Sequence, residues 1–272
     1  MGREGSVWLG TQGFSFIDWV GPFYPEGTTQ TTYLEEYAKR FPIVEIDSTF
    51  YGAPRATTVE GWKRRTPPAF QFAAKFPKLI THEKKLDRAL GDAEAFIGMM
   101  QALGDKLAVL TLQFAYDFTP ENFDRLEAFL AALPKGVRYA VELRNRGWVK
   151  PELGEMLSEH NVALVLQDLH YMPKLDWITT DFSVIRWLGR RKDIEQFDRI
   201  QIDRSQELDR WAESVRTFIG DGVDVFGFFN NHYAGHSPAS VRQFASLLGV
   251  ELPEAAPDDP AKSQLTLDLD HD

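Results

Sequence analysis

The sequence predicts a single (β/α)8 barrel over residues 1–250, followed by an acidic, flexible tail over residues 251–272. Two observations favour the barrel: short apolar segments recur eight times, and amphipathic segments with helical spacing lie between them. A third observation disfavours the alternative, a doubly wound open sheet, because the first apolar segment is not followed by a glycine-rich phosphate-binding turn. The 272 residues, 43% hydrophobic and 13% aromatic, suffice for a sizeable core.

The eight candidate strands are short apolar runs bounded by turn residues. They are expected over residues 7–12, 43–50, 70–75, 107–114, 138–143, 162–168, 182–189 and 223–230. Apolar residues recur every three or four positions in the segments between them, and this spacing predicts helices over residues 31–41, 119–133, 151–161, 205–219 and 237–249. We expect Thr119, Ser205 and Ser237 to cap three of these helices, Pro120 to open one of them, and Gly249 to end the last.

Composition and charge exclude several classes of protein. The chain has no cysteine, which excludes disulfides, thiol catalysis and cysteine-bound metal. It has no apolar run long enough to span a membrane and nothing that resembles a signal peptide, so a cytoplasmic location is expected. The net charge is −10, of which −6 lies in residues 251–272, so no strong bulk affinity for nucleic acid is expected. The basic run Arg186, Arg190, Arg191 and Lys192 is either a local patch or a solvated loop.

Carboxylates interrupt the second candidate strand, which reads VEIDSTF over residues 44–50. In a barrel, alternate residues face the surrounding helices and the interior. Val44 and Ile46 are therefore expected to face outward, and Glu45 and Asp47 inward. The same alternation turns further polar side chains inward, namely Gln12, Lys75, Thr111, Gln113, Glu142, Arg144 and Arg186. These groups form either a structural ion-pair network or an active site, and the site is favoured because this fold places its chemistry at the strand C-termini.

Acid/base catalysis is the first chemistry that these residues support. Two inward carboxylates, Glu45 and Glu142, can divide the roles of acid and base when their pKa values differ. His82, in the loop after the third strand, is a candidate general base, although it could simply be exposed. Asp168, at the end of the sixth strand, is a candidate catalytic or orienting group, although it could cap the following turn. The predicted catalytic set is Glu45, Lys75, His82, Glu142, Asp168 and Arg186.

Aromatic and amide side chains after the strand ends predict a binding surface. Rings there either stack on a sugar or base or close the barrel mouth as a plug. Asn230 and Asn231 either place amides over the pocket or form a tight turn, and the helix that follows could receive an anion. The predicted binding set is Gln12, Phe14, Trp19, Tyr24, Asp47, Tyr51, Gln113, Arg144, Trp148, Asn230 and Asn231.

A divalent metal is a further alternative, and the cofactor remains unknown at this point. The candidate ligands come from several strands and loops. They are Glu45, His82, Glu142, Asp168 and His232. Metal is less favoured, because the sequence contains no recognised metal-binding histidine motif.

Several segments in order resemble a known family. These include GTQGFSFIDWVGPFYPEG, VEIDSTFYGAP, FQFAAKFPKLITHEKKL, YAVELRNRGW and VFGFFNNHYAGHSPASVRQF. Over residues 7–249 the chain resembles the bacterial YecE-like family, domain of unknown function 72. The resemblance implies a TIM-type barrel and leaves the reaction open. The chain departs from the pattern at Gln12 and Phe14, where it implies serine and tryptophan, and at Asn145 and Leu188, where it implies histidines. A histidine-dependent step at those last two positions is therefore not expected.

The tail contains the hexapeptide QLTLDL at residues 264–269. It resembles the peptide with which bacterial proteins bind the DNA sliding clamp, in which leucines enter an apolar groove. The residues that carry this partner prediction are Gln264, Leu265, Leu267 and Leu269. The alternatives are a chance match or a tail strand that lies on the barrel.

Taken together, the sequence favours an enzyme with a polar acid/base site at the C-terminal face of the barrel. Its expected substrates are nucleic acid or nucleotide phosphodiesters, with the tail as a tether to the sliding clamp. Two alternatives remain: a non-catalytic module that binds a ligand, and a sugar-directed hydrolase or isomerase.

Overall fold

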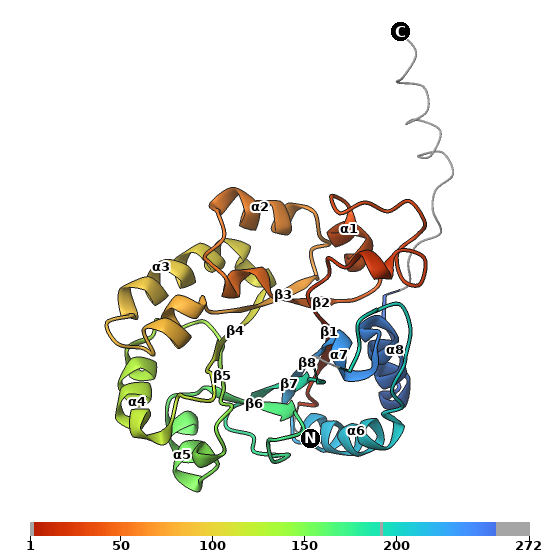
Figure 1. The fold of residues 1–272 in the computed structure, drawn as a ribbon. Coiled ribbons are helices and arrows are strands. Elements are labelled where there is room, and N and C mark those ends of the chain that lie inside the picture. Colours follow the sequence, from red (N-terminus) through yellow and green to blue (C-terminus); the bar gives the residue numbers. More distant parts are fainter. Residues whose placement is uncertain (1–2, 191–192, 254–272) are drawn as a thin grey trace.

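The structure is a computed structural model and describes residues 3–190 and 193–253. Eight parallel strands close into a barrel in chain order, with helices around it (Figure 1). The strands are β1 (Val7–Gln12), β2 (Ile43–Ile46), β3 (Gln71–Lys75), β4 (Leu107–Gln113), β5 (Tyr139–Glu142), β6 (Ala163–Asp168), β7 (Phe182–Trp187) and β8 (Asp224–Phe229). The predicted (β/α)8 barrel is therefore confirmed, and each observed strand lies within one of the eight predicted segments.

The helices follow the strands with one exception. They are α1 (Tyr33–Ala38), α2 (Ala56–Arg64), α3 (Leu90–Met100), α4 (Phe123–Ala132), α5 (Pro151–Glu159), α6 (Ser205–Gly220), α7 (Asn231–Ala234) and α8 (Ser237–Leu248). Residues 169–181, all of which the structure describes, connect β6 to β7 without a helix. No helix in the described part of the chain is long and apolar enough to cross a membrane.

Thr119 and Pro120 occupy the predicted cap and first positions of the 3-10 turn Pro120–Asn122 before α4, whereas the two predicted serine caps are displaced by one residue. Ser205 and Ser237 are the first helical residues of α6 and α8, and neither is the cap. Their backbone N–H groups donate to the side chains of Asp203, at 2.9 Å, and Asn231, at 3.0 Å. Gly249 ends α8 in the left-handed conformation, as the sequence predicts, where a residue with a Cβ would be strained.

The strands lie between two apolar cores, one outside the barrel and one inside it. Outward side chains such as Val44, Ile46 and Phe72 belong to the large core between the sheet and the helices. Inward side chains such as Val184 and Phe226 form a smaller core that fills the lower barrel. Because the lower interior is apolar, the inward polar side chains can gather only above it, towards the strand C-termini.

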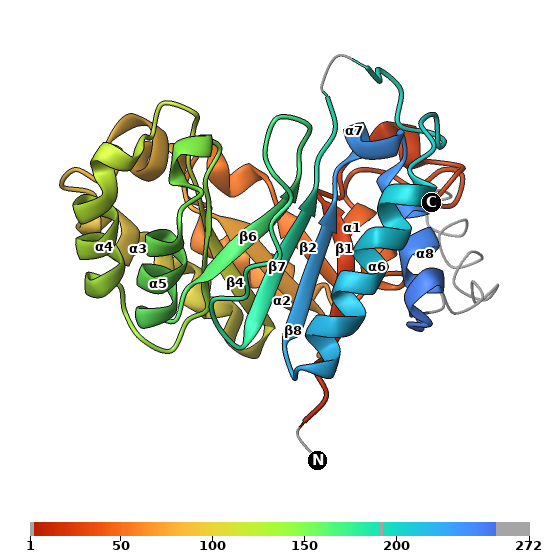
Figure 2. The same ribbon diagram turned by 90° about the horizontal axis from the view of Figure 1, so that it is seen from below.

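All the strands end at the same rim of the barrel, where the loops that follow them and α7 lie, opposite the N-terminus (Figure 2). Strand β2 ends at Ile46, earlier than predicted, because Ser48–Phe50 form a 3-10 turn. This turn brings Asp47 and Phe50 to the mouth of the barrel, where they line a pocket.

Candidate functional site

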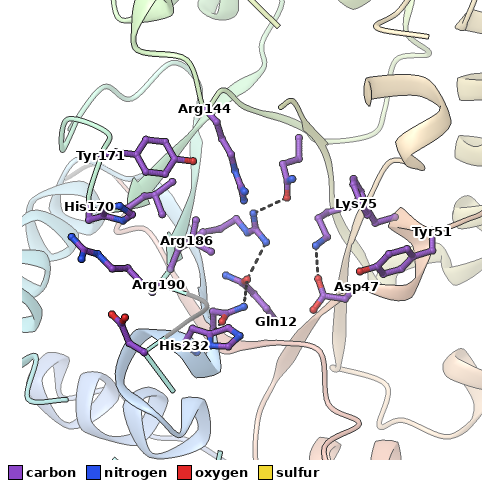
Figure 3. Close-up of a pocket in the computed structure, with 17 residues that line it drawn as sticks. Gln12, Asp47, Tyr51, Lys75, Arg144, His170, Tyr171, Arg186, Arg190 and His232 are labelled. Atoms are coloured by element: carbon purple, nitrogen blue, oxygen red, sulfur yellow. Dashed lines mark hydrogen bonds and ion pairs between the residues drawn. The ribbon is translucent and has the colours of Figure 1, made fainter. Parts of the chain in front are cut away.

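A cavity of about 620 Å³ opens at the C-terminal end of the barrel. Many of its lining residues are polar: Lys75 and Arg186 reach into it from β3 and β7, and Arg144 from the loop after β5 (Figure 3). The lining side chains are Gln12, Asp47, Phe50, Tyr51, Lys75, Gln113, Arg144, Leu169, His170, Tyr171, Arg186, Leu188, Gly189, Arg190, Asp193, Asn230 and His232.

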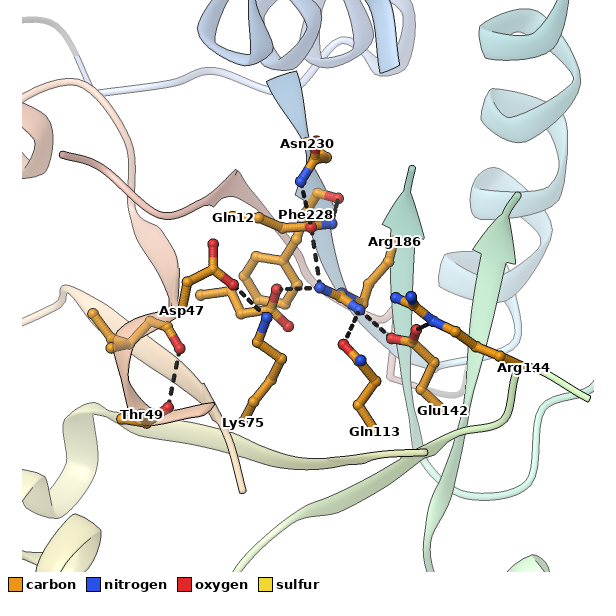
Figure 4. A network of polar contacts seen from close by, with 12 residues as sticks. Gln12, Asp47, Thr49, Lys75, Gln113, Glu142, Arg144, Arg186, Phe228 and Asn230 are labelled. Atoms are coloured by element: carbon orange, nitrogen blue, oxygen red, sulfur yellow. Dashed lines mark hydrogen bonds and ion pairs between the residues drawn. The ribbon is translucent and has the colours of Figure 1, made fainter. Parts of the chain in front are cut away.

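The guanidinium of Arg186 is the centre of a buried polar cluster in the pocket floor (Figure 4). Its Nη1 donates to Glu142 and, at 3.2 Å, to Oε1 of Gln113. Its Nη2 donates to Oε2 of Glu45 and to Oε1 of Gln12, each at 3.0 Å. The two Nη atoms carry four hydrogens, and four acceptors occupy them. Arg186 therefore has little left to offer a ligand, and its role is to hold these four side chains in place.

The two buried glutamates differ although both are fully buried. Both oxygens of Glu142 are used: Oε2 binds Arg186, and Oε1 accepts from Nε of Arg144 at 2.8 Å. Glu45 binds Arg186 through Oε2, whereas its Oε1 has no hydrogen-bond partner in the structure.

Their pKa values shift in opposite directions. Burial raises the pKa of the Glu45 carboxyl, and the attraction of Arg186 and Lys75 only partly offsets it. Burial also opposes ionisation of Glu142, but Arg186 and Arg144 outweigh it and lower the pKa of Glu142 to about 2. Glu142 is thus the permanently charged partner of Arg186, and Glu45 is the carboxylate that accepts a proton more readily.

Above the cluster, Lys75 and Asp47 form an ion pair at the pocket wall. The Lys75 side chain is mostly buried, whereas that of Asp47 is 38% exposed. The ammonium also lies 5.5 Å from the centre of the Phe50 ring, a cation–π distance. A carboxylate and an ammonium that face the cavity together can accept and donate protons to a bound molecule.

Arg144 faces the pocket with a fixed fork. Its Nε donates to Glu142 at 2.8 Å, and within the described part of the chain neither Nη atom forms a hydrogen bond or an ion pair. A guanidinium that is anchored at Nε and open at both Nη atoms matches a carboxylate or a phosphate.

The structure brings most of the predicted polar site residues together. Lys75 and Arg186 of the predicted catalytic set line the pocket, while Glu45 and Glu142 lie beneath its floor. Six of the predicted binding residues also line it, namely Gln12, Asp47, Tyr51, Gln113, Arg144 and Asn230.

The predicted aromatic collar is largely wrong. Trp19 and Tyr24 are buried in the core that the loop after β1 forms with helix α1. Trp148 is buried as well: its ring stacks on Phe118, and its Nε1 donates to the Phe118 carbonyl at 2.7 Å. Phe14 packs against the same outer core and does not line the pocket. These rings stabilise the loops, and only Tyr51 of the predicted rings reaches the cavity.

Asp168 and Asn231 have structural contacts outside the pocket. The Asp168 carboxylate accepts from Nε1 of Trp211 at 2.9 Å and from the Tyr233 hydroxyl at 3.2 Å, between β6 and the surrounding helices. Alternation already predicts this, because Gln167 faces inward and Asp168 therefore faces outward. Asn231 accepts from the N–H of Ser237 at the start of α8, which corrects its predicted role in substrate binding.

His82 lies beside the pocket and does not line it. Its ring packs edge-on against Phe50, with the centroids 4.9 Å apart, and its Nδ1 hydrogen-bonds with Oγ1 of Thr81 at 2.9 Å. Burial lowers the pKa of His82. In the described residues, no group of three or more histidine or acidic side chains is arranged to hold a metal ion, so the candidate ligands do not converge.

The pocket also contains residues that sequence reasoning missed. His170 and Tyr171 follow β6 directly, and Arg190 and Asp193 lie in the loop after β7. Their position after strand ends was the available signal, but a loop without a periodic pattern gives no direction for its side chains.

Comparisons with known proteins agree with this architecture. A family model described as protein of unknown function DUF72 matches residues 8–264. The UPF0759 protein YunF of Bacillus subtilis is 25% identical over 92% of this chain and 98% of its own length. The UPF0759 protein YecE of Escherichia coli K12 is 29% identical over 60% of this chain and 59% of its own.

Solved structures show the same fold. A DUF72 family protein from Thermotoga maritima superposes with a TM-score of 0.77 at 30% identity, covering 90% of this chain and 99% of that one. A B12-independent methionine synthase from Shewanella shares the fold alone, with a TM-score of 0.50 at 10% identity. The matched segment spans nearly all of the barrel, and the chain therefore belongs to the DUF72 family.

Proposed function

We propose that this protein is an enzyme that binds an anionic substrate in the pocket at the barrel mouth, and that the reacting group is a phosphodiester. The observation that carries the proposal is Arg144, whose Nε is fixed by Glu142 while both Nη atoms face the cavity. Such a fork binds two oxygens of one anionic group. Lys75 adds a second cation at the opposite wall.

The Asp47–Lys75 pair supplies the proton transfers in this proposal. Asp47 accepts a proton from an attacking water, whose oxygen forms the new bond to phosphorus. The bond from phosphorus to the leaving oxygen breaks, and Lys75 gives that oxygen a proton. Arg144 offsets the negative charge on the phosphoryl oxygens during the displacement. The products are an alcohol and a phosphate monoester, so atoms and charge balance.

The alternative of a sugar-directed hydrolase is less well supported. Such enzymes need two carboxyl groups on either side of an open space that receives the sugar. Glu45 and Glu142 are fully buried and are occupied by Arg186, and the carboxylates that do line the pocket are Asp47 and Asp193. A non-catalytic binding module uses the same Arg144 fork, and measurement of turnover separates it from an enzyme.

Ligand binding is tested first with mononucleotides and simple phosphodiesters by calorimetry and thermal shift. Arg144→Ala is expected to weaken binding about 10- to 100-fold, the loss of one bidentate charged contact. Arg64→Ala on α2, which removes the same charge far from the pocket, is the matched control and is expected to bind as wild type. Arg144→Lys keeps the positive charge but loses the bidentate geometry of the guanidinium. Its affinity for the ligand is expected to lie between those of wild type and Arg144→Ala. Equal affinity of Arg144→Ala and wild type would refute the proposal.

Turnover is tested with bis(4-nitrophenyl) phosphate and with dinucleotides. Asp47→Asn and Lys75→Met are expected to lower kcat by roughly 10²- to 10⁴-fold while ligands still bind. Binding without any turnover across these substrates would favour the non-catalytic module.

We also propose that the tail docks on the DNA sliding clamp through the hexapeptide at residues 264–269, which lie outside the described residues. The support is the pattern of Gln264, Leu265, Leu267 and Leu269 alone. Three leucines that enter a groove contribute roughly 1.5–3 kcal/mol each, about 4.5–9 kcal/mol together, before the ordering cost of the peptide is subtracted, so the expected interaction is micromolar at best. Titration of a peptide of residues 262–272 against purified clamp tests it, and no binding at about 1 mM removes it.

A further inference from the structure

The exposed apolar side chains gather at one end of the molecule. In residues 3–190 and 193–253, the large hydrophobic side chains with high exposure are Ile17, Tyr51, Leu79, Tyr116 and Ile200. Each lies in a loop that follows a strand, after β1, β2, β3, β4 and β7 respectively. They therefore lie around the pocket mouth, and all but Tyr51 lie outside the pocket itself. As single exposed side chains they are ordinary, and a binding surface is indicated only where neighbouring loops connect them to other groups.

One sector of this rim is a connected ledge built by the loops after β4, β5 and β6. Asn145 donates from Nδ2 to the Tyr116 carbonyl at 2.8 Å, which joins the first two loops. Arg146 donates from Nε to the Tyr171 carbonyl, which joins the second to the third. We call Tyr116, Arg146 and Tyr171 the ledge. The Tyr116 ring is 67% exposed, and Tyr171 also lines the pocket, so the ledge leads into the cavity.

The ledge is basic in a protein that is acidic overall. Residues 144–150, the loop after β5, contain Arg144, Arg146 and Lys150 and no acid, whereas the whole chain has a net charge of −10. Arg146 and Lys150 are exposed, and neither forms an ion pair within the part of the chain that the structure describes. Basic groups in the neighbouring loop are instead neutralised, for example Lys85 by Asp117. The loop after β5 thus brings two exposed basic side chains, those of Arg146 and Lys150, to this sector without an acidic partner in the described residues.

We propose that the ledge binds single-stranded nucleic acid and guides one of its phosphodiesters into the pocket. The inference rests on the proposed function and names its substrate class. A single strand presents flat bases that alternate with phosphates. Aromatic rings can stack on its bases, and cations between the rings can neutralise its phosphates. Tyr116 and Tyr171 supply the rings, in the loops on either side of the loop that carries Arg146. Bulk charge does not attract the strand, so recognition depends on this local sector.

The test is fluorescence anisotropy with a labelled 12-nucleotide thymidine oligomer, alongside thymidine monophosphate binding measured by calorimetry. Tyr116→Ser is expected to weaken oligomer binding roughly 10-fold, while Tyr116→Phe keeps the ring and binds as wild type. The double variant Arg146→Ser with Lys150→Ser is expected to lower the salt slope of oligomer binding by about 1.4. Monophosphate binding, which needs only the pocket, is expected to stay unchanged in all three proteins.

The double variant Arg64→Ser with Lys135→Ser, which changes exposed basic residues away from the ledge, is the matched control and is expected to bind the oligomer as wild type. Oligomer affinity no tighter than that of the monophosphate, or unaffected by the ledge variants, would overturn the inference while leaving the proposed function intact. Equal competition by a heparin fragment, a polyanion without bases, would also overturn it, because stacking would then contribute nothing. Arg144→Ala is expected to lose monophosphate binding. This outcome tests the proposed function and is independent of the ledge.

Discussion

Replacing each buried glutamate by glutamine should affect stability very unequally. Glu142→Gln and Glu45→Gln are the same chemical change at two fully buried positions around one arginine. Both carboxylate oxygens of Glu142 accept from arginines, so the new amide group must face a donor and leaves Arg186 and Arg144 undercompensated. Breaking a buried ion pair in this way costs roughly 3–5 kcal/mol.

Glu45→Gln should cost far less. The amide oxygen can replace Oε2 as the acceptor from Arg186, and the amide nitrogen can take the place of Oε1, which has no partner. Glu142 still neutralises Arg186, and the cost of burying a second charge disappears. We expect a loss of about 1 kcal/mol or less.

The assay is urea unfolding at pH 7, followed by melting temperatures. A loss of about 3 kcal/mol corresponds to a drop of roughly 6–10 °C for a domain of this size. Glu142→Gln should show that drop, and Glu45→Gln a drop of a few degrees at most. Equal losses, or a larger loss for Glu45→Gln, would refute the assignment of Glu142 as the permanent counter-charge of Arg186.

The pH dependence of the two variants should have opposite signs. The pKa of Glu142 is lowered to about 2 in the folded protein, against about 4.3 unfolded, so its contribution is full above pH 4.3 and is lost as the pH falls towards 2. The difference in unfolding free energy between wild type and Glu142→Gln should therefore shrink as the pH falls over that range. The pKa of Glu45 is raised, so its contribution is full below pH 4.3 and is lost as the pH rises through the folded pKa. Wild type should lose stability relative to Glu45→Gln as the pH rises above about 4.3.

Three further outcomes follow from the contacts. Asp168→Asn should lower the melting temperature, because the Asp168 carboxylate accepts hydrogen bonds from Trp211 and Tyr233. The ligand affinity measured by calorimetry should stay unchanged. A selective loss of affinity would contradict the placement of Asp168 outside the pocket. Removal of residues 254–272 should leave the melting temperature of the barrel unchanged and abolish clamp binding in a titration. Manganese or zinc should raise the melting temperature little relative to a chelator-treated sample, and a rise of several degrees would reveal a metal site.

Alternation along the strands predicted which side chains enter the barrel. Once a barrel is assumed, Val44 and Ile46 can face only the helices, and Glu45 only the interior. Both sets are where the rule puts them. The rule is reliable here because a strand has two faces and the outer core is almost entirely apolar. The same rule, applied to β6, would have removed Asp168 from the predicted site.

The loops resisted prediction for a physical reason. A ring after a strand end can turn towards the cavity or fold back under its own loop, and the local sequence is the same in both cases. Trp19 and Tyr24 fold back into the small core that their long loop forms with α1, while Tyr51 follows the short 3-10 turn Ser48–Phe50 and remains 74% exposed. The number of apolar neighbours in space decides the outcome, and only the tertiary structure supplies it.

Alternation gives the direction of a side chain and says nothing of its depth, and this difference changes the chemistry assigned to the site. Glu45 and Glu142 face inward as predicted, yet Arg186 and two glutamines close over them, so they cannot reach a ligand. The predicted pair of catalytic glutamates is better described as the support of the pocket floor. Two residues further along the chain from each, Asp47 and Arg144 emerge above that floor, beyond the ends of β2 and β5. The functional groups of this barrel are therefore expected just past its strand ends, where Glu142 fixes Arg144 and Lys75 pairs with Asp47.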